Sequence, residues 1–289
     1  MPISIPFSIT PNQLKRAVSK VFDVVGVNAL CFRLQKTLYG PYVRAVNYHE
    51  VLPQYAVTFE QHLEYYSRNF VSVDRDLLDR VLTDDEWQST RPGLILTFDD
   101  GHRTHVDIAA PLLEKYGFTG WFFVPVGLMD LNGEPGAKKI DNPNVLTLEQ
   151  LRYLAERHIV GSHTQTHCRL GKDLSPERLK SEIIGSRLHL QRVLGRQIDM
   201  FCWVGGEEES YGRAAAKLIS ENYTYSFMTN NAAIRFGTDR FQLQRTNIEA
   251  ENPLSLLRFQ LSGLMDLFYA NKRKRVNELT RHEPEGSPP

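Results

Sequence analysis

Two neighbouring carboxylates, Asp99 and Asp100, directly follow the apolar run Leu94–Phe98 in the stretch LILTFDDGHRTH. Like charges this close repel, and burying either one costs free energy unless a cation, a proton or water compensates it. Such a pair can divide into a metal ligand and a general base, or can lie on a solvated turn. We expect His102 and His105, in the same stretch, to belong to the loop or to the start of the next helix.

Two histidines, His163 and His167, follow another apolar run in the segment SHTQTH. On a helical turn, a spacing of four places both imidazoles on one face, where they can bind one ion. Two histidines and one aspartate suit Zn²⁺ or another divalent ion and leave coordination positions open. The spacing leaves open whether Asp99 or Asp100 would be the ligand.

Apolar, β-branched segments alternate with segments of helical periodicity along the chain. Strands are predicted in residues 42–51, 93–98, 118–126, 159–164, 199–206, 223–230 and 241–248, with a short strand and a helix within 70–87. Helices are predicted in residues 58–70, 107–117, 147–158, 175–195 and 211–222, with Thr58, Thr147 and Ser175 as N-caps. This alternation predicts an α/β fold with a parallel sheet, either open or closed into a barrel. Ligands of such folds bind at the carboxyl ends of the strands, where both motifs lie.

The composition is that of a soluble globular protein, with 42% hydrophobic and 24% charged residues in a chain of 289. Lys+Arg and Asp+Glu balance at 34 each, which excludes the global basic field of a nucleic-acid-binding protein. The three cysteines form neither a disulfide framework nor a structural zinc motif and fit a reducing compartment.

The ends of the chain are predicted to be helical. Residues 1–40 read as a helical extension, 41–275 as the main domain and 276–289 as a disordered tail. The segments Leu14–Lys36 and Leu254–Arg275 are amphipathic and basic, so each can pack on the domain or lie on a membrane surface. Since no secretory signal or membrane-spanning run is recognised, we expect a cytoplasmic protein, with the inner membrane surface as an alternative location.

Both motifs resemble those of a known enzyme family. The segment Leu94–Val124 resembles the first motif of the polysaccharide deacetylases (the NodB-homology family, carbohydrate esterase family 4), and GSHTQTH resembles their second motif, His-Ser/Thr-x-x-His. The segment MFCWVGG takes the place of the third motif. The resemblance extends over Val43–Ile248 and implies a distorted (β/α) barrel with fewer than eight regular units, and a hydrolase of non-peptide carbon–nitrogen bonds.

The resemblance implies separate roles for the two aspartates. Asp99 would be the general base, and Asp100, His163 and His167 would hold a divalent metal, Zn²⁺ in the first place, with Co²⁺, Ni²⁺ or Fe²⁺ as alternatives. The metal would polarise an acetamide carbonyl and lower the pKa of a water molecule. A backbone N–H of the Cys202–Val204 segment would help to hold the oxyanion.

The sequence departs from the common family pattern in two places. No Leu-x-His motif follows Leu254, but NYHEV resembles the permuted N-terminal segment of the poly-N-acetylglucosamine deacetylases, which makes His49 the candidate acid. The third motif lacks its proline, and Arg245 is the candidate cation that keeps Asp99 ionised. His49 and Arg245 can also be ordinary strand residues without a catalytic role. Candidate sugar-binding residues are Trp203, Gly205 and Tyr48.

The predicted function is that of a metal-dependent N-deacetylase acting on an N-acetylated glycan, in exopolysaccharide or cell-envelope biosynthesis. The alternatives are hydrolysis of another amide, such as a cyclic ureide, or of an O-acetyl ester on the same fold. A further alternative is a catalytically silent glycan-binding protein, against which the complete set of Asp99, Asp100, His163 and His167 argues. The sequence indicates no nucleic-acid partner and does not define an oligomeric state.

Overall fold

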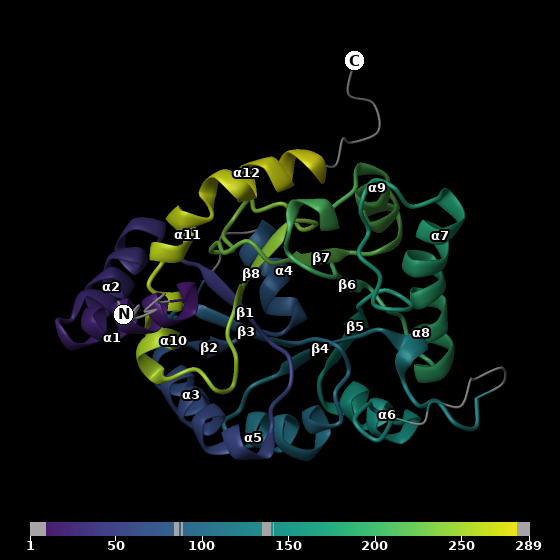
Figure 1. Cartoon of the computed structure of the whole chain (residues 1–289), viewed down its shortest axis with the longest axis horizontal. Coiled ribbons are helices and arrows are strands. Elements are labelled where there is room, and N and C mark those ends of the chain that lie inside the picture. Colours follow the sequence, from purple (N-terminus) through teal and green to yellow (C-terminus); the bar gives the residue numbers. More distant parts are fainter. Residues whose placement is uncertain (1–9, 84–86, 88, 135–139, 141, 282–289) are drawn as a thin grey trace, which may run out of the picture.

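Eight parallel β-strands form the centre of the molecule, and helices surround them (Figure 1). The computed structural model describes residues 10–281 apart from 84–86, 88, 135–139 and 141. The strands are β1 (Val43–Tyr48), β2 (Val71–Ser72), β3 (Gly93–Phe98), β4 (Gly120–Val124), β5 (Ile159–Ser162), β6 (Met200–Cys202), β7 (Tyr225–Met228) and β8 (Leu243–Asn247). Each strand lies within a segment for which the sequence predicts one.

Seven of these strands close into a barrel, because β1 pairs on both of its edges. All six residues of β1 pair with β3, from Val43 opposite Gly93 to Tyr48 opposite Phe98, and its last residues pair with β8. The remaining neighbours follow in the order β3–β4–β5–β6–β7–β8, and β2 pairs only with the first residues of β3. The predicted distorted barrel with fewer than eight regular units is therefore confirmed.

Side chains along each strand alternate between the barrel interior and the layer of helices. In β1, Val43 and Ala45 belong to the interior apolar cluster, whereas Val46 and Tyr48 pack with the helices. Helix α4 (Arg75–Thr83) adds apolar residues to the interior cluster, and its Asp79 accepts a hydrogen bond from Tyr225, the first residue of β7. Because α4 and apolar side chains fill the end where the strands begin, polar chemistry is left to the carboxyl ends.

The helices around the barrel follow the predicted order. They are α3 (Ala56–Asn69), α5 (Ala110–Lys115), α6 (Leu148–Arg157), α7 (Pro176–Lys180), α8 (Ser186–Leu194) and α9 (Arg213–Asn222), with π-helical turns η2 (His105–Ala109) and η4 (Ser181–Gly185) and 3-10 turns η1 (Pro53–Tyr55), η3 (Val126–Leu128) and η5 (Glu208–Ser210). Thr147 and Ser175 cap α6 and α7 as predicted, each accepting a backbone hydrogen bond. The predicted cap at Thr58 is wrong, because η1 leads directly into α3 and places Thr58 inside the helix.

Helices from both ends of the chain pack together on one side of the barrel (Figure 1). The predicted segment Leu14–Lys36 forms two helices, α1 (Pro11–Val24) and α2 (Val27–Tyr39), separated at Gly26, whose φ of 77° ends the first helix. The C-terminal segment forms α10 (Leu254–Leu261), α11 (Leu264–Phe268) and α12 (Ala270–Leu279). No helix in the described ranges is long and apolar enough to cross a membrane.

The ordered chain continues beyond the predicted start of the tail at residue 276. α12 runs to Leu279, and Val276 and Thr280 are buried against the domain. Thr280 also accepts a hydrogen bond from Gln242, which joins α12 to the segment before β8. Residues 282–289 of the predicted tail lie outside the described residues.

Candidate active site

A polar pocket of about 260 Å³ lies at the carboxyl ends of the barrel strands. Its lining includes every catalytic and metal-binding candidate from the sequence: His49, Asp99, Asp100, His163, His167 and Arg245. Most of these residues follow the ends of β1, β3 and β5, and Arg245 lies within β8, so closure of the barrel gathers residues that are up to 196 positions apart. The expectation that they meet at one mouth is confirmed.

Asp100, His163 and His167 direct their ligand atoms toward a common space. Oδ1 of Asp100 lies 2.9 Å from Nε2 of His167 and 3.6 Å from Nε2 of His163. This oxygen is buried and accepts no hydrogen bond of regular geometry, which leaves it available to a cation. One carboxylate and two imidazoles form a donor set suited to Zn²⁺ and similar divalent ions. The residues present therefore fit the metal that the sequence predicts.

The imidazole of His163 is prepared for metal binding by its surroundings. Its Nδ1 lies 3.0 Å from the carbonyl oxygen of Cys202, so the ring donates there and presents Nε2 as a lone pair to the pocket. Burial lowers the pKa of His163 and thereby favours the neutral form that a ligand must have.

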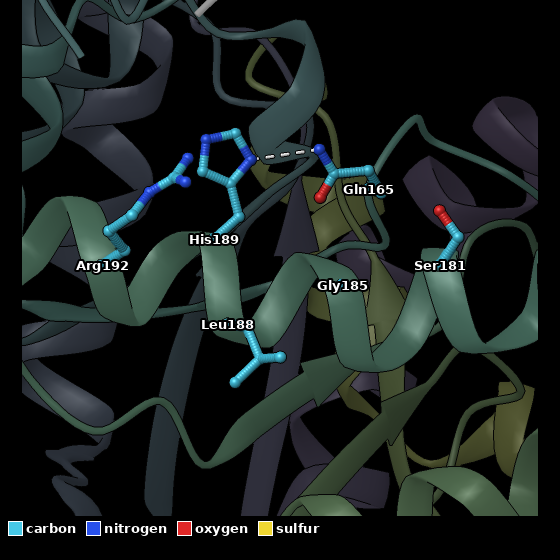
Figure 2. Close-up of a pocket in the computed structure, with 6 residues that line it drawn as sticks. All are labelled: Gln165, Ser181, Gly185, Leu188, His189 and Arg192. Atoms are coloured by element: carbon cyan, nitrogen blue, oxygen red, sulfur yellow. Dashed lines mark hydrogen bonds between the residues drawn. The ribbon is translucent and has the colours of Figure 1, made fainter. Parts of the chain in front are cut away.

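The loop between His163 and His167 is fixed on both sides. Gln165 contacts His189 of α8 through a side-chain hydrogen bond of 3.1 Å, at the edge of a separate outer pocket (Figure 2). Its backbone carbonyl accepts a hydrogen bond from Gly127. Thr166 donates from both its backbone N–H and its hydroxyl to the buried carboxylate of Glu182. These contacts hold the two histidines in place before any ligand arrives.

Backbone geometry explains how adjacent aspartates can share one pocket. In an extended strand, Asp99 and Asp100 would point to opposite faces of the sheet. Asp100 instead has a φ of 73°, a left-handed conformation that costs a non-glycine residue free energy. This turn brings both carboxylates to the barrel mouth.

Asp99 is held by a buried arginine. Nη1 and Nη2 of Arg245 each donate to one oxygen of Asp99, both at 2.8 Å, and both side chains are almost completely buried. Nη1 also donates to Asn47 and Thr97, which fixes the guanidinium from β1 and β3. Burial opposes ionisation of Asp99, but the Arg245 charge outweighs it and holds the pKa of this carboxyl below its usual value.

A second possible ligand set, Asp99, His163 and Cys202, also lies within the barrel mouth. Both oxygens of Asp99 already accept from Arg245, and a metal there would face that guanidinium. Burial raises the pKa of the Cys202 thiol well above its usual value, so the thiolate required for ligation is disfavoured. The set around Asp100 is therefore the better metal site.

His49 has a partner that the sequence did not suggest. Its Nδ1 lies 3.1 Å from a carboxylate oxygen of Glu249. The contact with Glu249 is the main reason that the pKa of His49 is raised to about 9, with Asp99 and Asp100 adding to it. In the β1–β8 register Asn47 is opposite Asn247, and His49 and Glu249 are each two residues further on. Only knowledge that β1 pairs with β8 would have revealed this pair.

Two predicted sugar-binding residues do not present their rings to the pocket. Tyr48 is fully buried among the helices, where its hydroxyl bonds to His62 and Tyr66. Trp203 borders the pocket but is only 1% exposed, packs on Tyr211 and donates to Ser226. Both predictions of ring stacking are wrong, because strand alternation turns these side chains to the outer layer.

Gly205 lines the pocket as predicted. It has a φ of 81°, and a Cβ atom there would lie 2.6 Å from Oγ of Ser210. The position therefore requires glycine, and the backbone at this point forms part of the pocket wall.

Replacing His167 is expected to weaken metal binding far more than replacing its neighbour His102. Loss of the ligand His167 should lower Zn²⁺ affinity by more than about 100-fold. His102 lies near Oδ2 of Asp100, the oxygen that does not face the two ligand histidines, so its loss should lower Zn²⁺ affinity by about tenfold. Calorimetric titration of zinc into His167→Ala and His102→Ala measures both values. Equal losses in the two variants would contradict the ligand assignment.

Comparisons with known proteins agree with this geometry. Residues 88–224 match the family described as polysaccharide deacetylase. YxkH of Bacillus subtilis (strain 168), a proposed polysaccharide deacetylase, is 30% identical over 162 residues, which are 55% of this chain and 53% of YxkH. The chain thus matches about half the length of this curated relative.

Solved structures show the same fold at low sequence identity. The deacetylase PplD of Streptococcus pyogenes, solved in complex with acetate, matches 76% of this chain and 98% of its own, with a TM-score of 0.63 and 20% identity. IcaB of Ammonifex degensii matches 79% of this chain and 98% of its own, with a TM-score of 0.62 and 20% identity. Residues 88–224, somewhat under half of the chain, thus match the polysaccharide deacetylase family, and the barrel has the fold of these two solved structures.

Proposed function

We propose that the protein is a metal-dependent deacetylase that removes acetyl groups from the amino sugars of an N-acetylated glycan. The observation that carries this proposal is the contrast between the two neighbouring aspartates. Both oxygens of Asp99 accept from Arg245, and Oδ2 lies 3.9 Å from Nε2 of His163. Asp100 instead faces both His163 and His167 with a buried oxygen that lacks a regular hydrogen bond. One carboxylate is thereby available as a ligand and the other as a base.

Asp100, His163 and His167 would hold the cation, which supplies Lewis-acid activation of the acetamide carbonyl and of a water molecule. Asp99 accepts the proton of the attacking water at one carboxylate oxygen. Its lowered pKa keeps it ionised at neutral pH and therefore ready to act as a base. Arg245 orients that carboxylate through two hydrogen bonds.

The segment after β6 supplies a donor for the oxyanion. Within the described residues, Trp203 donates its backbone N–H to Phe227, whereas no acceptor contacts the backbone N–H of Val204. Val204 lines the pocket together with Gly205. Its N–H is therefore a donor of this segment that can stabilise the negative charge developing on the carbonyl oxygen.

His49 is placed to protonate the departing amine. It lines the same pocket as the ligand set, and the contact with Glu249 favours its charged form. Without this proton the amine would leave as an anion, which is unfavourable in water. We expect His49→Ala to lower the rate of acetate release by about 100- to 10,000-fold, the usual contribution of a general acid.

Replacing Glu249 with glutamine is expected to move the alkaline limb of activity to lower pH. His49 loses its proton as pH rises through its pKa of about 9. The activity of the wild type should therefore fall at alkaline pH. The glutamine keeps a hydrogen-bond acceptor but removes the negative charge. The pH at which activity falls on the alkaline side should therefore decrease by at least about one unit. Rates of acetate release between pH 6 and 10 measure this, and an unchanged limb would contradict the role of the pair.

A substrate screen tests the proposed function. The purified chain, loaded with Zn²⁺ or Co²⁺, is incubated with chito-oligosaccharides and other N-acetylated glycans, and acetate and free amine are both quantified. We expect equal amounts of the two products, as hydrolysis of an acetamide requires. Acetate without amine would indicate an O-acetyl esterase, and inactivity on all glycans would favour another amide, such as a cyclic ureide, or a binding function.

We further place the reaction in the synthesis of an exopolysaccharide or cell-envelope glycan, in the cytoplasm or at the inner membrane surface. The support for this role is the fold shared with IcaB and the charged, open pocket, which suits a sugar better than an apolar ligand. Localisation of the tagged chain in cell fractions tests this part separately.

A further inference from the structure

Large apolar side chains are exposed mainly on the helices at one side of the barrel. Nine of the fourteen large apolar residues that are exposed in the described ranges belong to the α1–α2 segment and to α11. We call the seven of the α1–α2 segment the apolar face: Leu14, Val21, Val24, Val25, Leu30, Leu34 and Leu38. Leu267 and Phe268 of α11, the other two, are among the most exposed, at 74% and 76%.

The apolar face cannot be explained by packing within the domain. The inner sides of both helices already contact the barrel layer, where Phe22 packs on Phe259 and Phe32 packs on Phe70. Leu30, Leu34 and Leu38 recur every four residues on the opposite side of α2. A surface helix normally carries polar residues there, and exposed apolar residues gathered on neighbouring helices are typical of an interaction surface.

Basic residues accompany the apolar face. Residues 11–39 contain five Lys or Arg and one Asp, in a chain whose formal net charge is zero. Within the described residues, Lys20, Arg33 and Lys36 have no carboxylate within 4 Å. Two copies joined through the α1–α2 segment would bring two segments of net positive charge together, which disfavours self-association. An anionic bilayer matches both the apolar residues and the charge.

One of the helices that carry the apolar face, α1, also borders a second pocket beside the catalytic pocket. This second pocket of about 260 Å³ shares four residues with the catalytic pocket: Gly206, Glu207, Thr229 and Asn247. Its other wall is formed by Lys15 of α1 and by Tyr269 and Lys272 after α11. Lys15 and Tyr269 directly follow the exposed residues Leu14 and Phe268 in sequence. A glycan held at the surface of a bilayer would therefore enter the catalytic pocket past these lysines.

From these observations we propose that α1, α2 and α11 form a peripheral membrane-binding surface for anionic bilayers. The substrates would then be glycans carried at the membrane, with an anionic linkage near Lys15 and Lys272. The substrate part of this inference rests on the proposed deacetylase function. The binding of the surface to lipid does not, and the two can be measured separately.

Vesicle flotation tests the membrane-binding surface. The full chain is mixed with vesicles of phosphatidylethanolamine and phosphatidylglycerol, or of phosphatidylcholine alone. We expect the wild type to float with the anionic vesicles and the variant Val21→Asp/Leu30→Asp/Leu34→Asp to bind at least about 100-fold more weakly. The matched control is Leu188→Asp on α8, which is as exposed as Leu30 at 57% and should bind like the wild type.

Several outcomes would overturn the inference. These are a wild type that does not float, a triple variant that floats equally well, or a wild-type dimer that the triple variant abolishes without any lipid binding. A second variant, Lys20→Glu/Arg33→Glu/Lys36→Glu, keeps the apolar residues and should lose the preference for phosphatidylglycerol. Acetate release from soluble chito-oligosaccharide should be unchanged in all variants, which separates failure of the surface from failure of the enzyme.

Discussion

Replacing Arg245 with methionine is expected to destabilise the protein by about 3–5 kcal/mol and to remove nearly all deacetylase activity. The substitution leaves the Asp99 carboxylate buried without its cation, and it also leaves Asn47 and Thr97 without their shared donor. The pKa of Asp99 should rise, because burial then acts without opposition. A protonated Asp99 cannot accept a proton from water, so turnover falls as well.

The buried pair of Arg44 and Asp266 offers a matched control for this prediction. It has the same bidentate geometry, with distances of 2.8 and 2.7 Å, but joins β1 to α11 on the outer side of the barrel. Arg44→Met should cost a similar free energy of unfolding and leave the turnover of folded enzyme unchanged. Denaturant unfolding and acetate release, measured on both variants, separate the two effects. Equal turnover in the two variants would contradict a catalytic positioning role of Arg245.

The Asp99–Arg245 pair also sets a pH dependence of stability. Because the pKa of Asp99 is lower in the folded protein than in the unfolded chain, the pair contributes stability above the unfolded value of about 4. That contribution is lost as pH falls through the lower pKa of the folded state. In Arg245→Met the pKa of Asp99 in the folded state is no longer lowered. The decrease in folding stability that the pair causes at acid pH should therefore be absent from this variant.

Replacing Asp99 with asparagine is expected to lower acetate release by about 1,000-fold or more. Asparagine has nearly the same shape and can still accept a hydrogen bond from Arg245, but it cannot take the proton of water. The matched control is Asp107→Asn, an exposed aspartate of the following helical turn that pairs with Arg103. It should retain wild-type turnover. Activity of Asp99→Asn within tenfold of the wild type would show that another group acts as base.

The residue pattern predicted the alternating α/β fold and the place of the site, and the resemblance to a known family added the closed barrel. Apolar runs that end in Asp99 or lead into His163 mark strands whose carboxyl ends carry chemistry, and parallel topology brings such ends together. Arg245 could be named as the candidate cation because the family that the chain resembles often uses an arginine of the third motif to orient the base, and the third motif of this chain has none.

What the sequence did not predict depends on long-range pairing and on side-chain direction. Tyr48 and Trp203 neighbour site residues in the chain, yet strand alternation turns both away from the pocket. Glu249 becomes visible as the partner of His49 only when β1 and β8 are known to pair. The division of Leu14–Lys36 into two helices was also missed, although Gly26, which has a φ of 77°, is a residue type that commonly ends helices.

The central claim is that two adjacent carboxylates perform different tasks, and metal content tests it most directly. Zinc is quantified by atomic emission in wild type, Asp99→Asn and Asp100→Asn after equal loading and dialysis. We predict one zinc per chain in wild type and in Asp99→Asn, and little zinc in Asp100→Asn, whose oxygen faces both histidines. Loss of zinc from Asp99→Asn with retention in Asp100→Asn would contradict the assignment of ligand and base.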